Sequence, residues 1–152
     1  MTARNLRATR RTVGKLLISS VAVLWPVGAF AADWNETHVF NPTWSPHAKF
    51  HNGQTIATSI ELAALSLWQL WGPPRHTPDS LRWGTLFAGL YFATQVPAAL
   101  FPGADVVDPQ FADRLPVVGG VRLNQVLMSL VGSMPALALG YRLAVPTVAE
   151  DN

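Results

Sequence analysis

Three of the four histidines in the chain, His38, His47 and His51, lie close together in the sequence. If a helix begins at Ser45-Pro46, His47 and His51 stand at positions i and i+4 on one face of it. Two such imidazoles can bind a metal, and His38 and Glu36 from the preceding loop can complete the ligand set. Imidazole and carboxylate ligands suit zinc or non-haem iron. The alternative is that the histidines only hold an outer loop in place through hydrogen bonds.

Glu61 is the one acidic residue within the apolar segment 53–72. A carboxylate inside a membrane is costly unless it is paired, hydrated or protonated, so such residues are commonly functional. We expect Glu61 to act as a catalytic proton donor or acceptor together with His47 and His51. The alternative is a neutral Glu61 that makes a structural hydrogen bond to a neighbouring helix. Its candidate partners are Gln95, Tyr91 and Ser129.

Polar residues on the predicted second helix form a stripe. At about 100° per residue, the side chains that fall near one line are His47, His51, Gln54, Thr58 and Glu61. Because lipid cannot receive polar groups, we expect this stripe to face the interior of the helices or a wet crevice that opens outward. The sequence therefore predicts a pocket for a small, partly apolar molecule. The residues expected to bind that molecule are Gln54, Thr58, Gln95 and Tyr91.

Four apolar segments carry these side chains. They cover about 16–32, 53–72, 83–104 and 123–141, and each approaches the roughly 20 residues that cross a bilayer as a helix. The chain of 152 residues is 49% hydrophobic and only 13% charged, which is unlike a soluble domain of that size. The sequence predicts an all-α fold, in which residues 1–152 form a single membrane domain. We expect a transmembrane four-helix bundle with a His- and Trp-rich outer loop.

The charges in the connections predict an orientation. Residues 1–15 form an arm with five basic and no acidic side chains, and the connection 72–82 is also basic. The positive-inside rule then places both termini in the cytoplasm of a multi-pass protein of the plasma or inner membrane. The first segment has a second interpretation, because residues 10–32 also resemble a signal peptide that is cleaved near Ala31.

Helix-breaking residues predict how the segments are connected and bent. A short turn after residue 72 predicts that the second and third helices are antiparallel neighbours. Prolines and glycines predict an irregular loop over 102–122, with a short helix at about 108–115. Pro97 and Pro135 are expected to kink the third and fourth helices.

The composition also excludes several classes of function. With no cysteine, the chain can form no disulfide, thiolate metal site or dithiol redox centre. Aromatic residues do not interleave the basic arm, so we expect no nucleic-acid partner. No recognisable cofactor motif is present, and the cofactor stays unknown. The expected partners are the lipid bilayer and either a second copy of the chain or another membrane protein.

The sequence Thr37-His38-Val39-Phe40-Asn41-Pro42, followed by Trp44 and Pro46-His47-Ala48, resembles the DoxX-like group of small four-helix membrane proteins. The resemblance implies a bundle of four membrane helices. It also implies an oxidoreductase or quinone-related role, since that group has been linked with such roles.

Three functions are therefore compatible with the sequence. The first is binding or transformation of a small molecule at the polar pocket. The second is a non-enzymatic membrane subunit that docks a partner through the loop 33–51. The third is a proton-coupled carrier that acts as an oligomer.

Overall fold

The computed structural model describes residues 2–72 and 77–145 of the chain. In chain order, its elements are α1 (Ala3–Asp33), α2 (Pro46–Trp71), α3 (Pro78–Ala98), the 3-10 helix η1 (Pro109–Arg114), β1 (Val117–Val118), β2 (Val121–Arg122), α4 (Gln125–Met128), the π-helix η2 (Ser129–Ser133) and α5 (Met134–Ala144). The predicted all-α class is confirmed, since the short β1–β2 hairpin is the only β structure in the described ranges.

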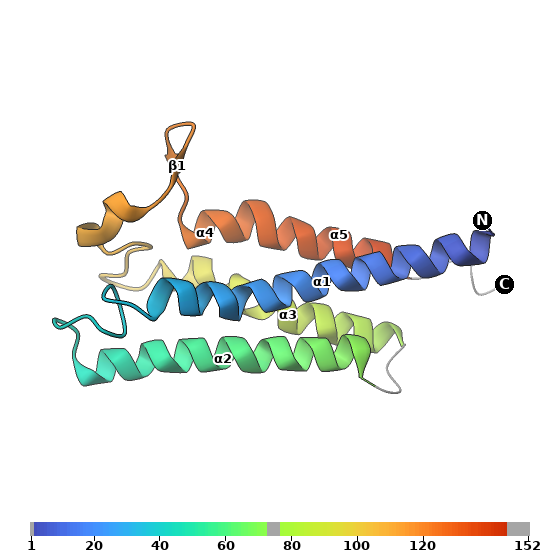
Figure 1. Cartoon of the computed structure of the whole chain (residues 1–152), viewed down its shortest axis with the longest axis horizontal. Coiled ribbons are helices and arrows are strands. Elements are labelled where there is room, and N and C mark those ends of the chain that lie inside the picture. Colours follow the sequence, from blue (N-terminus) through green and yellow to red (C-terminus); the bar gives the residue numbers. More distant parts are fainter. Residues whose placement is uncertain (1, 73–76, 146–152) are drawn as a thin grey trace.

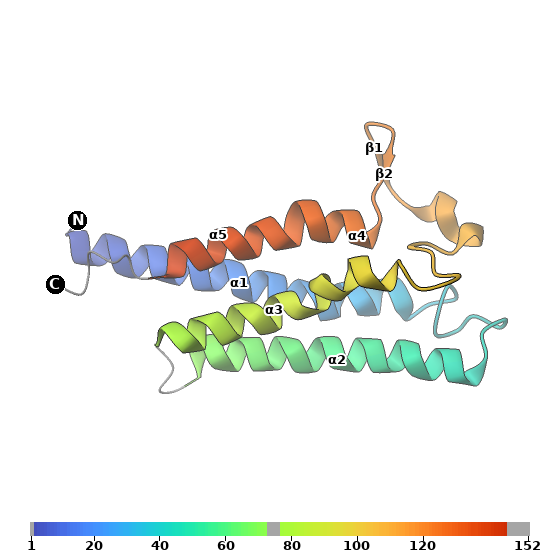
Figure 2. The same cartoon turned by 180° about the vertical axis from the view of Figure 1, so that it is seen from behind.

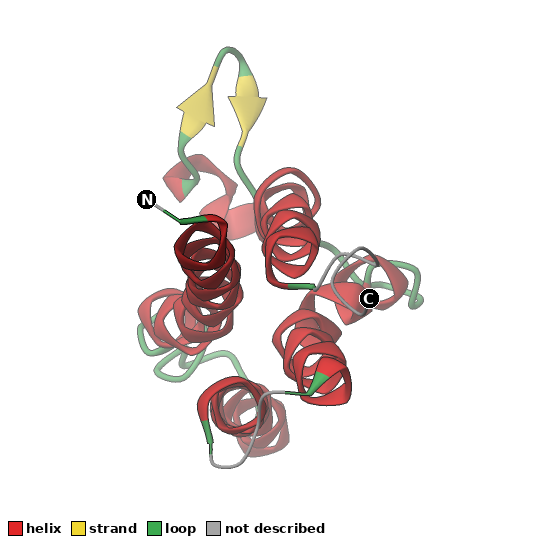
Figure 3. Ribbon diagram, turned by 90° about the vertical axis from the view of Figure 1, so that its right-hand side faces the viewer, coloured by secondary structure: helices red, strands yellow, loops and turns green. Residues whose placement is uncertain are grey.

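The long helices lie side by side, and Figure 3 shows them nearly end-on. α1, α2, α3 and the segment α4–η2–α5 have roughly parallel long axes (Figures 1 and 2). Their most extensive contacts join α1 with α5, α2 with α3, and α1 with α2. α2 and α3 are antiparallel neighbours, as predicted (Figure 1). The loop 34–45 and the segment 99–124 lie at one end of the molecule, and the start of α1 lies at the other.

Local sequence signals explain where the helices begin. The Ser45 hydroxyl accepts a hydrogen bond from the Ala48 amide at 3.1 Å, and Pro46 occupies the first helical position. The predicted start of the second helix is confirmed. α1 begins much earlier than the first apolar segment, at Ala3, because arginine is a good helix former. The predicted basic arm is therefore largely helical.

The third predicted segment, 83–104, extends beyond the end of the helix that the structure forms there. α3 ends at Ala98, next to Pro97, and residues 99–104 form turns that include Gly103 at φ 76°. The following loop has the predicted short helix, η1. It also has an unpredicted hairpin, in which Gly119 and Gly120 have φ of 58° and 80°. Positive φ at both central residues is what a tight two-residue hairpin requires.

A π-helix precedes Pro135 in the last helical segment. η2 covers Ser129–Ser133 and joins α4 to α5 without a break. Proline has no amide proton and its ring collides with the preceding turn, and a π turn relieves that conflict. The predicted effect of Pro135 thus takes the form of a local widening of the helix.

The buried core is small and closely packed. Its apolar residues come from α1, α2, α3 and α5, and they include Ile18, Val21, Leu70, Leu81, Phe92 and Leu137. α1 and α5 approach each other most closely at two glycines. A Cβ atom on Gly14 would stand 2.5 Å from the Gly140 carbonyl oxygen, and one on Gly140 would stand 2.9 Å from the Gly14 carbonyl oxygen. Only glycine fits this crossing.

Two helices in the described ranges are long and apolar enough to cross a membrane. They cover Arg4–Asp33 and Gln125–Ala144, with mean hydropathy of 1.7 and 1.4 in their most apolar windows. α2 and α3 do not reach this level. Polar residues lower the hydropathy of α2, and Asp79, Arg82 and Gln95 lower that of α3. Two of the four predicted spans are therefore shown as candidates. Residues 73–76 of the predicted basic connection lie outside the described residues.

Candidate functional site

The polar stripe of α2 faces outward. The residues of the predicted stripe are all exposed: His47, His51, Gln54, Thr58 and Glu61. Of the two surroundings that the sequence predicts for them, they therefore do not occupy the interior of the helices, and a wet crevice that opens outward stays a prediction. The inward side of α2 carries Ile56, Ser59, Ala63, Ser66 and Leu70 instead.

Close packing explains why the small residues of α2 face inward. The Ser66 hydroxyl donates a hydrogen bond to the Gly84 carbonyl oxygen of α3 at 2.8 Å. The Leu70 side chain covers Gly84 directly, because a Cβ there would stand 2.8 Å from the Leu70 Cγ. Small side chains let the backbones of α2 and α3 approach, so dispersion contacts favour this arrangement over one with longer polar side chains inside.

His47 and His51 form a pair on the exposed surface. Their Nε2 atoms lie 3.1 Å apart, and the His51 Nδ1 lies 3.3 Å from the Gln54 Oε1. The bond between the two histidines uses the i, i+4 spacing that the sequence predicts. No group of three or more His, Cys, Asp or Glu side chains within residues 2–72 and 77–145 could hold a metal ion. Within these residues, the histidine pair therefore has no third protein ligand of these types.

The other predicted metal ligands lie elsewhere in the loop. His38 Nδ1 is 2.6 Å from the Thr37 hydroxyl and 3.7 Å from an Asp33 carboxylate oxygen. Its ring packs edge-on against Trp44, with centroids 5.0 Å apart. Glu36 binds Arg114 at 2.6 Å. His38 and Glu36 thus do not join the histidine pair in one metal site, and His38 helps to hold the loop, as the alternative interpretation expected.

Hydrogen bonds inside the loop 34–45 give it a fixed shape. The buried Asn41 is only 2% exposed. Its amide nitrogen donates to the Thr37 carbonyl oxygen at 3.2 Å, and its side-chain oxygen accepts from the Thr43 amide at 2.9 Å. The loop is therefore a structured cap over one end of the helices (Figure 1).

The Glu36–Arg114 ion pair ties this cap to η1. A hydrogen bond from its own backbone, followed by the hydrogen bond and charge of Arg114, lowers the pKa of Glu36 from its ordinary value of 4.5. A lowered pKa favours the folded protein above pH 4.5, and this contribution is lost as the pH falls through the lowered pKa. Glu36→Gln should therefore be slightly less stable than the wild type at pH 7, with a difference that shrinks as the pH falls below 4.5. Melting temperatures over this pH range measure it, and a difference independent of pH would contradict the assignment.

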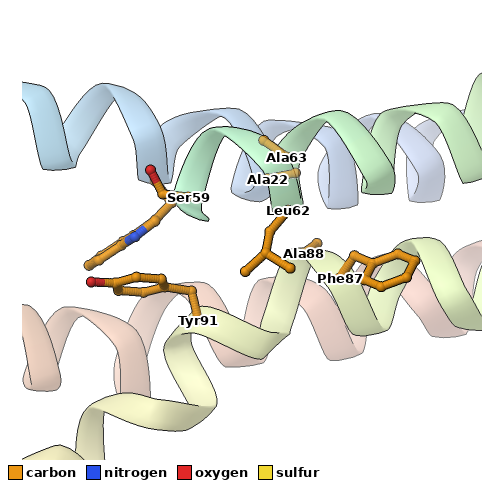
Figure 4. Close-up of a pocket in the computed structure, with 8 residues that line it drawn as sticks. Ala22, Ser59, Leu62, Ala63, Phe87, Ala88 and Tyr91 are labelled. Carbon is orange, nitrogen blue, oxygen red and sulfur yellow. The ribbon is translucent and has the colours of Figure 1, made fainter. Parts of the chain in front are cut away.

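Tyr91 is half-buried between the helices, away from the polar stripe of α2. It stands beside a cavity of about 10 Å³, enough for one water molecule, between α1, α2 and α3 (Figure 4). The Trp25 ring packs against Tyr91 with centroids 4.5 Å apart, and Ser59 lies on the same cavity. The lining residues are Ala22, Trp25, Ser59, Leu62, Ala63, Phe87, Ala88 and Tyr91. This cavity is far smaller than the several hundred Å³ typical of ligand sites.

Gln95 also faces the interior, and it is only 7% exposed. Among the described residues its side-chain oxygen meets no hydrogen-bond partner, and the same is true of the Asn52 side-chain oxygen. The Asn52 amide donates instead to Asp33 at 2.8 Å, which joins α2 to the end of α1. Sequence reasoning placed Tyr91 and Gln95 in the ligand site but missed Trp25 and Asn52. Asn52, Ser59 and Ser66 are spaced along one side of α2, and this spacing could have indicated that Asn52 faces the other helices.

The structure therefore separates the predicted ligand-binding residues into two groups. Gln54 and Thr58 lie on the exposed side of α2, whereas Tyr91 is half-buried and Gln95 is buried on α3. The proposed structural hydrogen bond from Glu61 to these interior residues is also not formed, because Glu61 faces outward. Ser129 is used within its own helix, where its hydroxyl donates to the Gln125 carbonyl oxygen at 2.8 Å.

Comparison with known proteins gives one match. The model of a family of unknown function (DUF6640) matches residues 17–144. This range begins within α1 and includes the whole of α2, α3 and α5. No curated protein and no solved structure matches the chain significantly.

Proposed function

The chain belongs to the DUF6640 family of unknown function, and we propose that it is a non-enzymatic, multi-pass membrane subunit that binds a second copy of itself through α2. The side of α2 that carries Gln54, Thr58, Glu61 and Leu65 is called its outer face below. The exposure of Glu61 on that face carries the proposal, because a carboxyl group in the middle of a membrane helix needs a polar partner.

The distribution of apolar residues supports a membrane location. Only 22% and 17% of the residues in the two most apolar windows are buried, whereas a core helix of a soluble protein is mostly buried. Large apolar side chains are also exposed along α2 and α3. They include Ile60, Leu65 and Trp68 of α2 and Trp83, Leu86 and Leu90 of α3. Lipid would cover these side chains, except Leu65 on the outer face of α2, if α1, α2, α3 and α4–η2–α5 all cross the bilayer. That arrangement makes four crossings with both termini in the cytoplasm.

The packing of α1 supports its retention in the mature protein. Ile18 is fully buried, and Val21 and Ala22 are nearly so. These residues contact the other helices at the centre of the core. Cleavage near Ala31 would remove this part of the core and expose the helices that pack against it, so we place α1 among the membrane helices and not in a signal peptide.

Glu61 lies near the middle of the apolar part of α2. At 1.5 Å per residue it stands about 12 Å from Gly53 and about 16 Å from Gly72 along the helix. On a lipid-facing surface at that depth, a carboxylate costs several kcal/mol. Contact with another protein removes this cost, and it also removes Gln54 and Thr58 from lipid.

The outer face of α2 is suited to a second copy of itself. Gln54 and Thr58 each carry a hydrogen-bond donor and an acceptor, and the carboxyl group of Glu61 does so when it holds a proton. A two-fold axis would place each near its own equivalent, so every donor can meet an acceptor. Gly53 and Ala57 are exposed beside this face, and no atom lies within 4 Å of a Cβ built on Gly53. This spacing of small residues permits a close helix–helix contact.

Disulfide cross-linking can test the contact between copies. Because the chain has no cysteine, a single introduced cysteine is its only thiol. Thr58→Cys should form covalent dimers when membranes are oxidised, because residues near a two-fold axis come within the 3.5–4.5 Å between Cβ atoms that a disulfide needs. Leu90→Cys is the matched control, since Leu90 is exposed on α3 at a comparable depth. Dimers are measured on a non-reducing gel. Equal cross-linking of both variants, or none of Thr58→Cys, would contradict the proposal.

A further inference from the structure

A basic pocket lies between the start of α1 and the end of α5. Its volume is about 280 Å³, and it is lined by Arg7, Ala8, Arg10, Arg11, Leu143, Ala144 and Val145. Three arginines thus line the pocket beside a short apolar wall. We propose that this pocket binds the phosphate of an anionic phospholipid headgroup, with the apolar wall beside the lipid's glycerol and first acyl carbons.

The two described helix segments that line the pocket carry charges of one sign. α1 up to Lys15 and the whole of α5 carry no acidic side chain. Their basic residues are Arg4, Arg7, Arg10, Arg11, Lys15 and Arg142. A cluster of this kind at the cytoplasmic side of membrane helices attracts anionic headgroups, and the attraction is strongest within about 8 Å at physiological salt.

The arginines can bind phosphate while keeping their present contacts. Arg10 Nη2 donates to the Arg142 carbonyl oxygen at 3.0 Å, which fixes Arg10 against the last turn of α5. Arg7 and Arg11 also make interactions of their own. A guanidinium has five N–H donors in a planar fork, so one bond leaves several for phosphate oxygens. Arginine is better suited than lysine to such bidentate contacts.

Trp71 places the pocket at the level of the headgroups. Its Nε1 donates to the Ser19 hydroxyl at 2.8 Å, and the Lys15 ammonium lies 4.1 Å from the centre of its ring. Tryptophan and lysine in contact are typical of a membrane interface. Along α1, Arg11 lies about 6 Å beyond Lys15 and Arg7 about 12 Å beyond it. This inference rests on the proposed membrane crossing but not on the contact between copies.

The test uses the purified full chain in a zwitterionic detergent, with its unfolding followed by tryptophan fluorescence. The probes are dioctanoyl phosphatidylglycerol, dioctanoyl phosphatidylcholine and inorganic phosphate, each titrated separately. We expect the phosphatidylglycerol alone to raise the melting temperature in a saturable way. Arg10→Gln should weaken its apparent affinity about tenfold through loss of a charge-assisted bidentate contact. Arg4→Gln, which removes one charge from the same arm but not from the pocket lining, should change it by less than about twofold.

Three outcomes would overturn the proposal. Equal effects of the two lipids would mean that the acyl chains, and not the headgroup charge, stabilise the protein. An equal effect of inorganic phosphate would assign the pocket to the free anion. Equal losses in Arg4→Gln and Arg10→Gln would assign the effect to general charge attraction. None of these outcomes affects the cross-linking of Thr58→Cys, so failure of the lipid site is distinguishable from failure of the proposed self-association.

Discussion

Replacing Gly14 by alanine should destabilise the protein by about 2 kcal/mol or more. The new Cβ would stand 2.5 Å from the Gly140 carbonyl oxygen and 2.7 Å from the Ala144 amide nitrogen. Both are backbone atoms of α5, which cannot rotate aside as a side chain can. α1 and α5 must therefore separate, and the contacts of Ile18 between them are weakened.

The control for this prediction is Gly28→Ala on the same helix. No atom of a neighbour lies within 4 Å of a Cβ built on Gly28. Alanine is a better helix former than glycine by about 1 kcal/mol, so this variant should be as stable as the wild type or slightly more stable. Thermal unfolding of both variants in the same detergent measures the difference. Equal stability of Gly14→Ala and Gly28→Ala would show that the close crossing of α1 and α5 is not formed.

Replacing Glu61 by lysine should abolish self-association, whereas Glu61→Gln should retain it. Lysine places two like charges across the two-fold axis in a medium of low dielectric constant. Glutamine keeps one donor and one acceptor group on a side chain of the same length, so it can replace a protonated Glu61 in a hydrogen-bonded pair. We expect the dimeric fraction to fall more than about tenfold with lysine and by less than about threefold with glutamine.

Leu90→Lys is the matched control for the effect of a cation at this depth. Leu90 is exposed on α3, away from the outer face of α2. A lysine there should make membrane insertion less favourable, as Glu61→Lys does. It should leave the dimeric fraction unchanged. The dimeric fraction is measured in lipid nanodiscs, where each chain carries one fluorophore and the fluorophores in each single complex are counted. Loss of dimers in both variants alike, or retention in Glu61→Lys, would remove Glu61 from the contact.

Local sequence signals predicted much of the fold. The start of α2 follows from the Ser45 hydroxyl and Pro46, whose effects depend only on neighbouring residues. The antiparallel arrangement of α2 and α3 follows from their short connection. The early start of α1 and the hairpin were missed, although Gly119 and Gly120 are the kind of residues that a tight hairpin turn requires.

The direction of the polar stripe could not be predicted from periodicity alone. A period of 3.6 residues shows that Gln54, Thr58 and Glu61 share one side of a helix. It does not show which side meets the other helices. That choice depends on the fit between α2 and α3, where Ser66 bonds to the backbone and Leu70 fills the space above Gly84. The same choice leaves Tyr91 and Gln95 apart from the stripe, which divides the predicted ligand site.

The accessibility of a nitroxide label at Thr58→Cys in lipid bilayers tests the central claim most directly. Dissolved oxygen concentrates in lipid, a polar nickel chelate concentrates in water, and a protein–protein contact excludes both. We predict low collision rates with both reagents at residue 58, and high oxygen collision at the control position Leu90→Cys, which is exposed on α3. High oxygen collision at residue 58 would show that the outer face of α2 meets lipid. High nickel collision there would show that it meets water, and either result would contradict a membrane helix that binds a second copy.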